Sequence, residues 1–107
     1  MANNYKNKKL DLTTTNATVL YTCPNATSGL VKSILVSEDS GNADTITVTI
    51  TDASSGLFSL FKVKAVASNT TIELLTAPLV VQENEVLSCT AATANRLHVV
   101  ASLLEVS

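Results

Sequence analysis

Aromatic residues and glycine are scarce in this sequence. It has no tryptophan, two phenylalanines and two tyrosines, so aromatic residues make up 4% of its 107 residues. Proteins that hold single-stranded nucleic acid or sugars by stacking need exposed rings, and these rings are too few to fill a core and also line a groove. With three glycines, the chain has no phosphate-binding glycine loop. These shortages argue against binding sites for nucleic acid, carbohydrate and nucleotides.

Charge is scarce as well. Charged residues make up 15% of the chain, whereas a typical soluble domain has about 25%. The net charge is −2, without the basic excess expected of a nucleic-acid-binding protein. The surface of a free monomer normally carries about 25–35% charged residues. We therefore expect neighbouring subunits to cover part of this surface. The alternative is a threonine-rich domain of modest solubility.

Long apolar runs are absent. No run approaches the ~18 residues that span a bilayer, and the polar N-terminus does not resemble a secretion signal. We therefore expect the chain to fold in a reducing cytosol. Cys23 and Cys89 are then interpreted as small buried residues, and a disulfide formed after cell lysis is the alternative. Their spacing matches no zinc or redox motif.

The side chains that carry chemistry form no recognisable active site. His98, the single histidine, lies on an apolar strand without a nucleophile motif, so we interpret it as a packed or surface residue. The acidic residues near turns are interpreted as turn caps, with a calcium site as the weaker alternative. They are Glu38, Asp39, Asp44 and Asp52, followed by Glu83 and Glu85. We expect no enzymatic activity, catalytic residue, cofactor, metal or small-molecule substrate.

Alternation of apolar and polar residues recurs along the chain, and a helical period does not. In residues 44–52, Ile46, Val48 and Ile50 share one face and four threonines share the other, which predicts a half-buried strand. A preceding apolar segment, 29–37, is expected to pair with it as a hairpin. Segments of strand character cover 9–13, 18–23, 29–37, 44–52, 57–66, 71–76, 79–82, 86–91 and 96–106.

The number and spacing of these segments predict an all-β fold. About eight short strands separated by turns are typical of a single antiparallel β-sandwich, either jelly-roll or immunoglobulin-like. A small closed barrel is the runner-up. Residues 57–60 do not alternate cleanly, which predicts a β-bulge or a second buried face. The final strand is apolar on both faces, so it is either central or covered from outside the domain.

The N-terminal residues are polar and basic. We predict a flexible, extended arm over residues 1–9 and a β-sandwich domain over 10–107. An arm of this kind can become ordered on a partner, and Lys6, Lys8 and Lys9 suit an acidic protein surface or a phosphate. With Tyr5, they are the candidate partner-binding residues. A solvated tail is the alternative.

Four segments resemble small virion structural proteins of tailed bacteriophages, especially phages of marine bacteria and cyanobacteria. They are residues 19–24 (VLYTCP), 31–37 (VKSILVS), 77–83 (APLVVQE) and 97–105 (LHVVASLLE). The resemblance extends over nearly the whole chain from Thr18 onward. Its motifs are structural rather than catalytic, so no functional residue is carried over.

The resemblance implies a β-sandwich virion component assembled in the host bacterial cytoplasm. We expect a head decoration or cement protein that sits on the major capsid protein lattice as a homotrimer and stabilises the head. The alternatives are a neck, tail or fibre protein, or a host-surface binding module on the virion exterior. Neither nucleic acid nor membrane is an expected partner.

Overall fold

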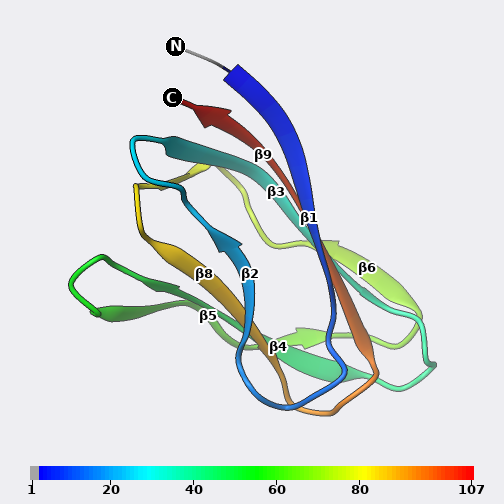
Figure 1. Ribbon diagram of the computed structural model, residues 1–107. Helices are drawn as coiled ribbons and strands as arrows, with labels where there is room; N and C mark the ends of the chain where they lie inside the picture. The colour runs from blue at the N-terminus through cyan, green and yellow to red at the C-terminus, as the bar shows by residue number, and fades with distance from the viewer. Residues whose placement is uncertain (1–2) are drawn as a thin grey trace.

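The computed structural model describes residues 3–107, in which the chain forms nine strands and no helix (Figure 1). The all-β prediction is confirmed, and the segments 57–66 and 86–91 have the predicted bounds. The strands are β1 (Asn3–Asp11), β2 (Thr18–Thr22), β3 (Ser28–Glu38), β4 (Asp44–Thr51), β5 (Leu57–Val66), β6 (Thr70–Glu73), β7 (Leu79–Val81), β8 (Val86–Ala91) and β9 (Leu97–Val106).

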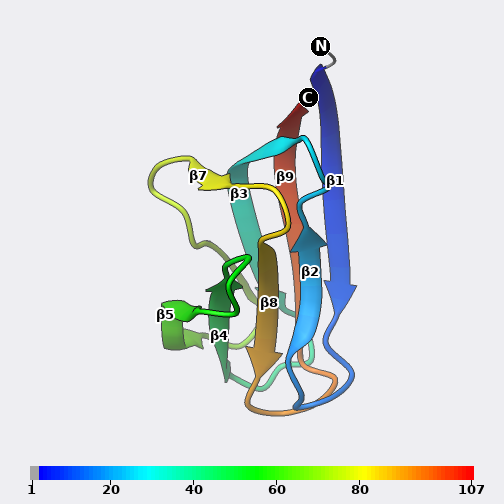
Figure 2. The same cartoon turned by 60° about the vertical axis from the view of Figure 1, so that its left-hand side comes forward.

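The strands form two antiparallel sheets that pack face to face (Figure 2). Sheet A has the order β1-β9-β3-β6, with β7 also paired to β3. Sheet B has the order β2-β8-β4-β5. The predicted sandwich is therefore confirmed. The described strands pair only within their own sheet, unlike those of the closed barrel that was the runner-up.

The strand pairs are nested. β1 pairs with β9, β2 with β8, β3 with β6 and β7, and β4 with β5. The chain therefore runs as one long folded-back hairpin that is wound into two sheets. This nesting is the jelly-roll arrangement, and it decides between the two sandwich types that the sequence left open.

The hairpin expected between residues 29–37 and 44–52 is wrong. β3 lies in sheet A and β4 in sheet B, so the connection over 39–43 crosses from one sheet to the other. Both edges of β3 are already occupied, by β9 on one side and by β6 and β7 on the other. The consecutive strands that do pair are β4 and β5.

The flexible arm predicted over residues 1–9 is also wrong, as far as the structure describes it. From Asn3 onward these residues belong to β1, which is paired with β9 from Asn3↔Val106 to Asp11↔His98. The strand therefore runs through the expected boundary between residues 9 and 10. Pairing satisfies backbone groups of β9 that would otherwise face an open edge, and it makes β9 the central strand that its two apolar faces predicted. Residues 1–2 lie outside the described part.

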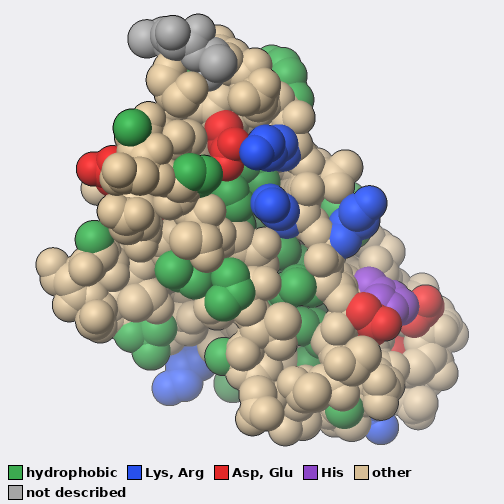
Figure 3. Space-filling view, viewed as in Figure 1, with side chains coloured by type: hydrophobic (Ala, Val, Ile, Leu, Met, Phe, Trp, Pro, Cys, Tyr) green, Lys and Arg blue, Asp and Glu red, His purple; other side chains and the backbone are tan. Residues whose placement is uncertain are grey.

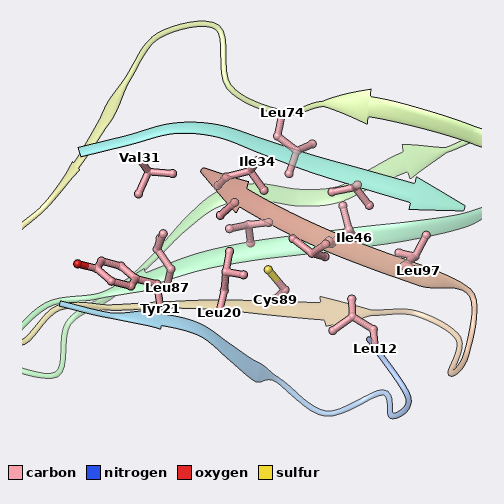
Figure 4. Packing of buried hydrophobic residues seen from close by; sticks show 14 of the residues in the cluster. Leu12, Leu20, Tyr21, Val31, Ile34, Ile46, Leu74, Leu87, Cys89 and Leu97 are labelled. Atoms are coloured by element: carbon pink, nitrogen blue, oxygen red, sulfur yellow. The ribbon is translucent and has the colours of Figure 1, made fainter. Parts of the chain in front are cut away.

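The core lies between the two sheets (Figure 4). Side chains of β2 and β8 on one side meet those of β3 and β9 on the other, as Leu20, Leu87 and Cys89 do with Ile34 and Leu97. The predicted alternation of β4 is confirmed, since Ile46 and Val48 are fully buried beneath the outward-facing threonines. In β5 the register with β4 shifts twice, which confirms a bulge there.

Candidate functional site

Twelve paired strand positions on the outer face of sheet B carry no charged side chain, and one lysine, Lys62, lies beside them where the register of β5 shifts opposite Thr47. The pairing register and the alternation of side chains along each strand place the twelve residues on the same face. They are Val19 and Thr22 of β2, Val86, Ser88 and Thr90 of β8, Thr45, Thr47, Thr49 and Thr51 of β4, and Leu57, Ser59 and Ala65 of β5. The face is therefore an array of hydroxyl and small apolar groups.

The edge strand β5, which forms one border of this face, exposes apolar groups. Leu57 is 66% exposed, Phe58 56% and Val63 61%. Val63 has a φ of 53°, a conformation that β-branched residues rarely adopt. Its backbone N–H donates to Thr47 Oγ1 at 3.0 Å, so the bulge bonds to a threonine of the face.

A groove of about 310 Å³ opens at the same end of the sandwich. It is lined mainly by apolar side chains, among them Leu60, Phe61, Leu75, Pro78 and Leu79. Phe61 and Leu79 are half-buried and pack on the core. The groove and the exposed side chains of β5 together form an apolar region of the described surface.

The candidate arm residues lie on β1, at the free edge of sheet A. Tyr5 is 77% exposed, and the Lys32 ammonium lies 5.5 Å from the centre of its ring. Lys6 Nζ pairs with Glu105 Oε1 at 2.8 Å. Neither Lys8 nor Lys9 takes part in any of the ion pairs found within residues 3–107. Basic side chains gather along this edge in Figure 3.

The structure thus brings together Tyr5 and Lys6 with a residue that sequence reasoning did not single out. A shallow hollow of about 300 Å³ has Tyr5, Lys6 and Lys32 in its lining. Lys32 comes from β3, where the register with β9 shifts between Val31 and Ser33. No signal in the sequence marks that shift, so Lys32 was missed.

Glu105 is the charged group at the centre of a contact between the sheets. It is 6% exposed and accepts a 2.7 Å hydrogen bond from the Tyr21 hydroxyl. The hydrogen bonds from Lys6 and Tyr21 hold the pKa of Glu105 below its usual value, and burial opposes them. Burial, with the bond to Glu105, raises the pKa of Tyr21. The charged carboxylate is therefore the stable form at neutral pH.

Five of the six carboxylates near turns act as caps, as interpreted from the sequence, whereas Asp39 lies against His98 instead. Glu38 accepts hydrogen bonds from Ser40, Gly41 and Asn69. Burial alone would raise the pKa of Glu38, but these bonds outweigh it and bring the pKa to about 2. The other four carboxylates also accept hydrogen bonds from backbone N–H groups. Asp44 accepts from Thr93, Asp52 from Ser54 and Gly56, Glu83 from Ala26, and Glu85 from Gln82.

His98 is a surface residue between two aspartates. Its ring nitrogens lie 3.3 Å from Asp11 Oδ1 and 3.5 Å from Asp39 Oδ2, and all three side chains are exposed to solvent. The histidine side chain (purple) lies against acidic side chains in Figure 3. Within residues 3–107, no group of three or more histidine, cysteine or acidic side chains is arranged to hold a metal ion.

The two cysteines are buried and free, as the buried-residue interpretation expected. The Cys23 thiol lies 3.2 Å from the Thr27 carbonyl oxygen, to which it donates. Burial raises the pKa of Cys89 to about 12. Neither thiol is therefore part of an exposed reactive group. The part of the chain that the structure describes contains no helix able to cross a membrane.

Comparison with known proteins finds distant structural likeness only. No protein-family model matches the chain, and no curated protein matches it. A crystal structure of the CBM22-1-GH10 modules of Clostridium thermocellum endo-1,4-beta-D-xylanase 10B, complexed with xylohexaose, is similar with a TM-score of 0.42 and 10% identity. The match covers 96% of the present chain and 24% of that one. A likeness at this level carries no argument about function.

Proposed function

We propose that this chain is a structural virion protein, a head decoration or cement protein that binds the major capsid protein lattice as a homotrimer. The observation that carries the proposal is the set of twelve paired positions without a charge on the outer face of sheet B, with Lys62 at its edge. Twelve strand positions without a charge are unusual for a surface that remains in water, because charged side chains normally keep such faces soluble and separate. If another subunit packs on this face, the lack of charged residues at these positions is explained.

The outer face of sheet B is too small to form a stable interface between subunits by itself. With strands about 4.8 Å apart and about 3.4 Å per residue, the four-stranded face measures roughly 300–400 Å². A stable interface buries about 800 Å² on each partner. The face therefore supplies about half of the area needed. The exposed Phe58 and Val63 at the edge of β5 lie outside the twelve positions and supply further area.

A closed ring of three subunits would cover both the outer face of sheet B and the groove beside β5. In a trimer each copy presents one surface to the next, so two different patches are covered on every subunit. Sheet B and the edge of β5 provide the first patch, and the groove beside β5 lies close to it. The resemblance to phage virion proteins supports the same function. The proposal includes no catalytic step.

Light scattering tests the proposal. The mass of the purified chain is measured alone, and then after mixing with capsid shells that lack the protein. We expect a stable trimer that binds the shells. A trimer or larger ring that does not bind the shells would assign the protein to the neck, tail or fibre instead. A monomer at high concentration would contradict the proposal.

A further inference from the structure

β1 is a long and regular edge strand. Its nine residues, Asn3–Asp11, pair with β9 without a register shift, and the other side of the strand pairs with no part of residues 3–107. An unpaired edge presents a row of backbone N–H and C=O groups that accept a further strand. The other long edge strand, β5, is interrupted by two register shifts and is a poorer template.

The side chains of β1 place positive charge on both sides of this edge. Lys6 and Lys8 pair with Leu103 and Ala101, whose side chains are buried, so they lie on the core side of the sheet. Lys9 pairs with Val100 on the outer side. A strand added to β1 would thus have ammonium groups beside both of its faces. Like charges disfavour pairing of β1 with the β1 of a second copy.

The carboxylates of the chain all contact other residues of the same chain. Each of the nine aspartates and glutamates has a hydrogen bond or an ion contact with another residue of the same chain. The closest pair in sequence that is not on a strand, Glu83 and Glu85, caps the turn before β8. A second copy therefore has no extended acidic segment to offer, whereas Lys8 and Lys9 form none of the ion pairs between described residues.

We propose that the free edge of β1 binds an extended acidic segment of a partner protein, which adds to sheet A as a further strand. Backbone hydrogen bonds to β1 hold the segment, and its carboxylates lie opposite Lys8 on the core side or Lys9 on the outer side. This inference rests on the proposed function, since it names the chemistry by which the partner is recognised. The edge is formed before the partner arrives, so no flexible arm has to be ordered.

A synthetic peptide tests charge recognition. A nine-residue peptide of alternating glutamate and threonine matches the length of β1. We expect it to bind the full-length chain at low salt, whereas a peptide of alternating lysine and threonine does not. The variant Lys8→Glu/Lys9→Glu should weaken binding by about tenfold or more. The matched control Lys62→Glu/Lys64→Glu, on the edge strand β5, should leave it unchanged. Equal loss in both variants would overturn the proposal.

Backbone methylation tests strand pairing. A glutamate-threonine peptide whose backbone nitrogens are all methylated keeps its charge and loses its donors. We expect it to lose binding, and equal binding of both peptides would show charge attraction without a strand. A single-stranded oligonucleotide of equal charge should bind more weakly than the peptide, and tighter binding would overturn the choice of partner. These measurements do not depend on the mass of the oligomer or on capsid binding, so their failure is separate from failure of the proposed function.

Discussion

The Tyr21 hydroxyl donates a 2.7 Å hydrogen bond to Glu105 Oε2 inside the protein, 84 residues along the chain. Tyr21 belongs to β2 in sheet B and Glu105 to β9 in sheet A, so the bond joins the two sheets. Lys6 Nζ pairs with the other oxygen of the same carboxylate at 2.8 Å. One buried carboxylate therefore links β2, β9 and the edge strand β1. Two predictions follow from this contact.

Replacing Tyr21 by phenylalanine removes one partner of this carboxylate. A hydrogen bond to a buried charged group stabilises a protein by about 1.5–3 kcal/mol, so we expect the free energy of unfolding to fall by about that amount. The matched control is Tyr5→Phe, because Tyr5 is 77% exposed and should change stability by less than ~0.5 kcal/mol. Urea unfolding of both variants measures the difference. Equal stabilities would contradict the account of this contact.

Replacing Gly29 by alanine should disturb the same contact from the side of β3. A Cβ atom at Gly29 would lie 2.8 Å from the Tyr21 hydroxyl oxygen and 2.8 Å from its Cε2 atom. Overpacking of this kind costs about 1–3 kcal/mol. In a Tyr21→Leu background the cost of Gly29→Ala should be smaller, because the ring is gone. The same cost in both backgrounds, measured by urea unfolding, would assign the effect to the backbone instead.

Acid should remove the contribution of Glu38 to stability. Its pKa is about 2 in the folded chain and 4.5 ordinarily, so the charged form is favoured by folding. The stabilisation is therefore complete above pH 4.5 and is lost as the pH falls towards 2. Glu38→Gln should be less stable than the unmodified chain at neutral pH and nearly equal to it near pH 2. Unfolding curves at a series of pH values test this. A constant difference across the series would contradict it.

The strained residue in β5 gives the next prediction. Val63 has a φ of 53° and its side chain is 61% exposed, so glycine relieves strain and loses little packing. We expect Val63→Gly to leave stability unchanged or to raise it by about 1 kcal/mol. Ala65→Gly, in the same strand, should lower stability by about 0.5–1 kcal/mol. If thermal unfolding shows the same loss for both variants, Val63 is not strained.

Much of the fold was predictable because most strands have one buried face. In β4, apolar residues and threonines alternate from Thr45 to Thr51, and the threonines lie on the outer face as the pattern indicated. β1 was missed because it is exposed on both sides, so its residues carry no apolar alternation. Its place in the sheet follows from the free edge of β9. The pairing of β3 was misjudged because neighbours in sequence, β3 and β4, lie in different sheets.

The candidate surfaces were predictable only in part. The shortage of charge indicated a covered surface, but the pairing register was needed to collect the uncharged positions on one face. Tyr5 and the lysines of the N-terminal segment were singled out from the sequence. Lys32 and Glu105 were not, since Lys32 reaches Tyr5 from a shifted register in β3. Contacts between residues this far apart in the sequence leave no local pattern.

The most direct test of the central claim is the mass of two charge variants, measured by light scattering. Thr49→Glu places a carboxylate in the middle of the outer face of sheet B, and Ser102→Glu places one on the outer face of sheet A. Both replace a small hydroxyl residue on an inner strand, and urea unfolding checks that both variants fold. We predict that the unmodified chain and Ser102→Glu are trimers and that Thr49→Glu is a monomer. A folded Thr49→Glu variant that remains a trimer would contradict the assignment of this face as the interface.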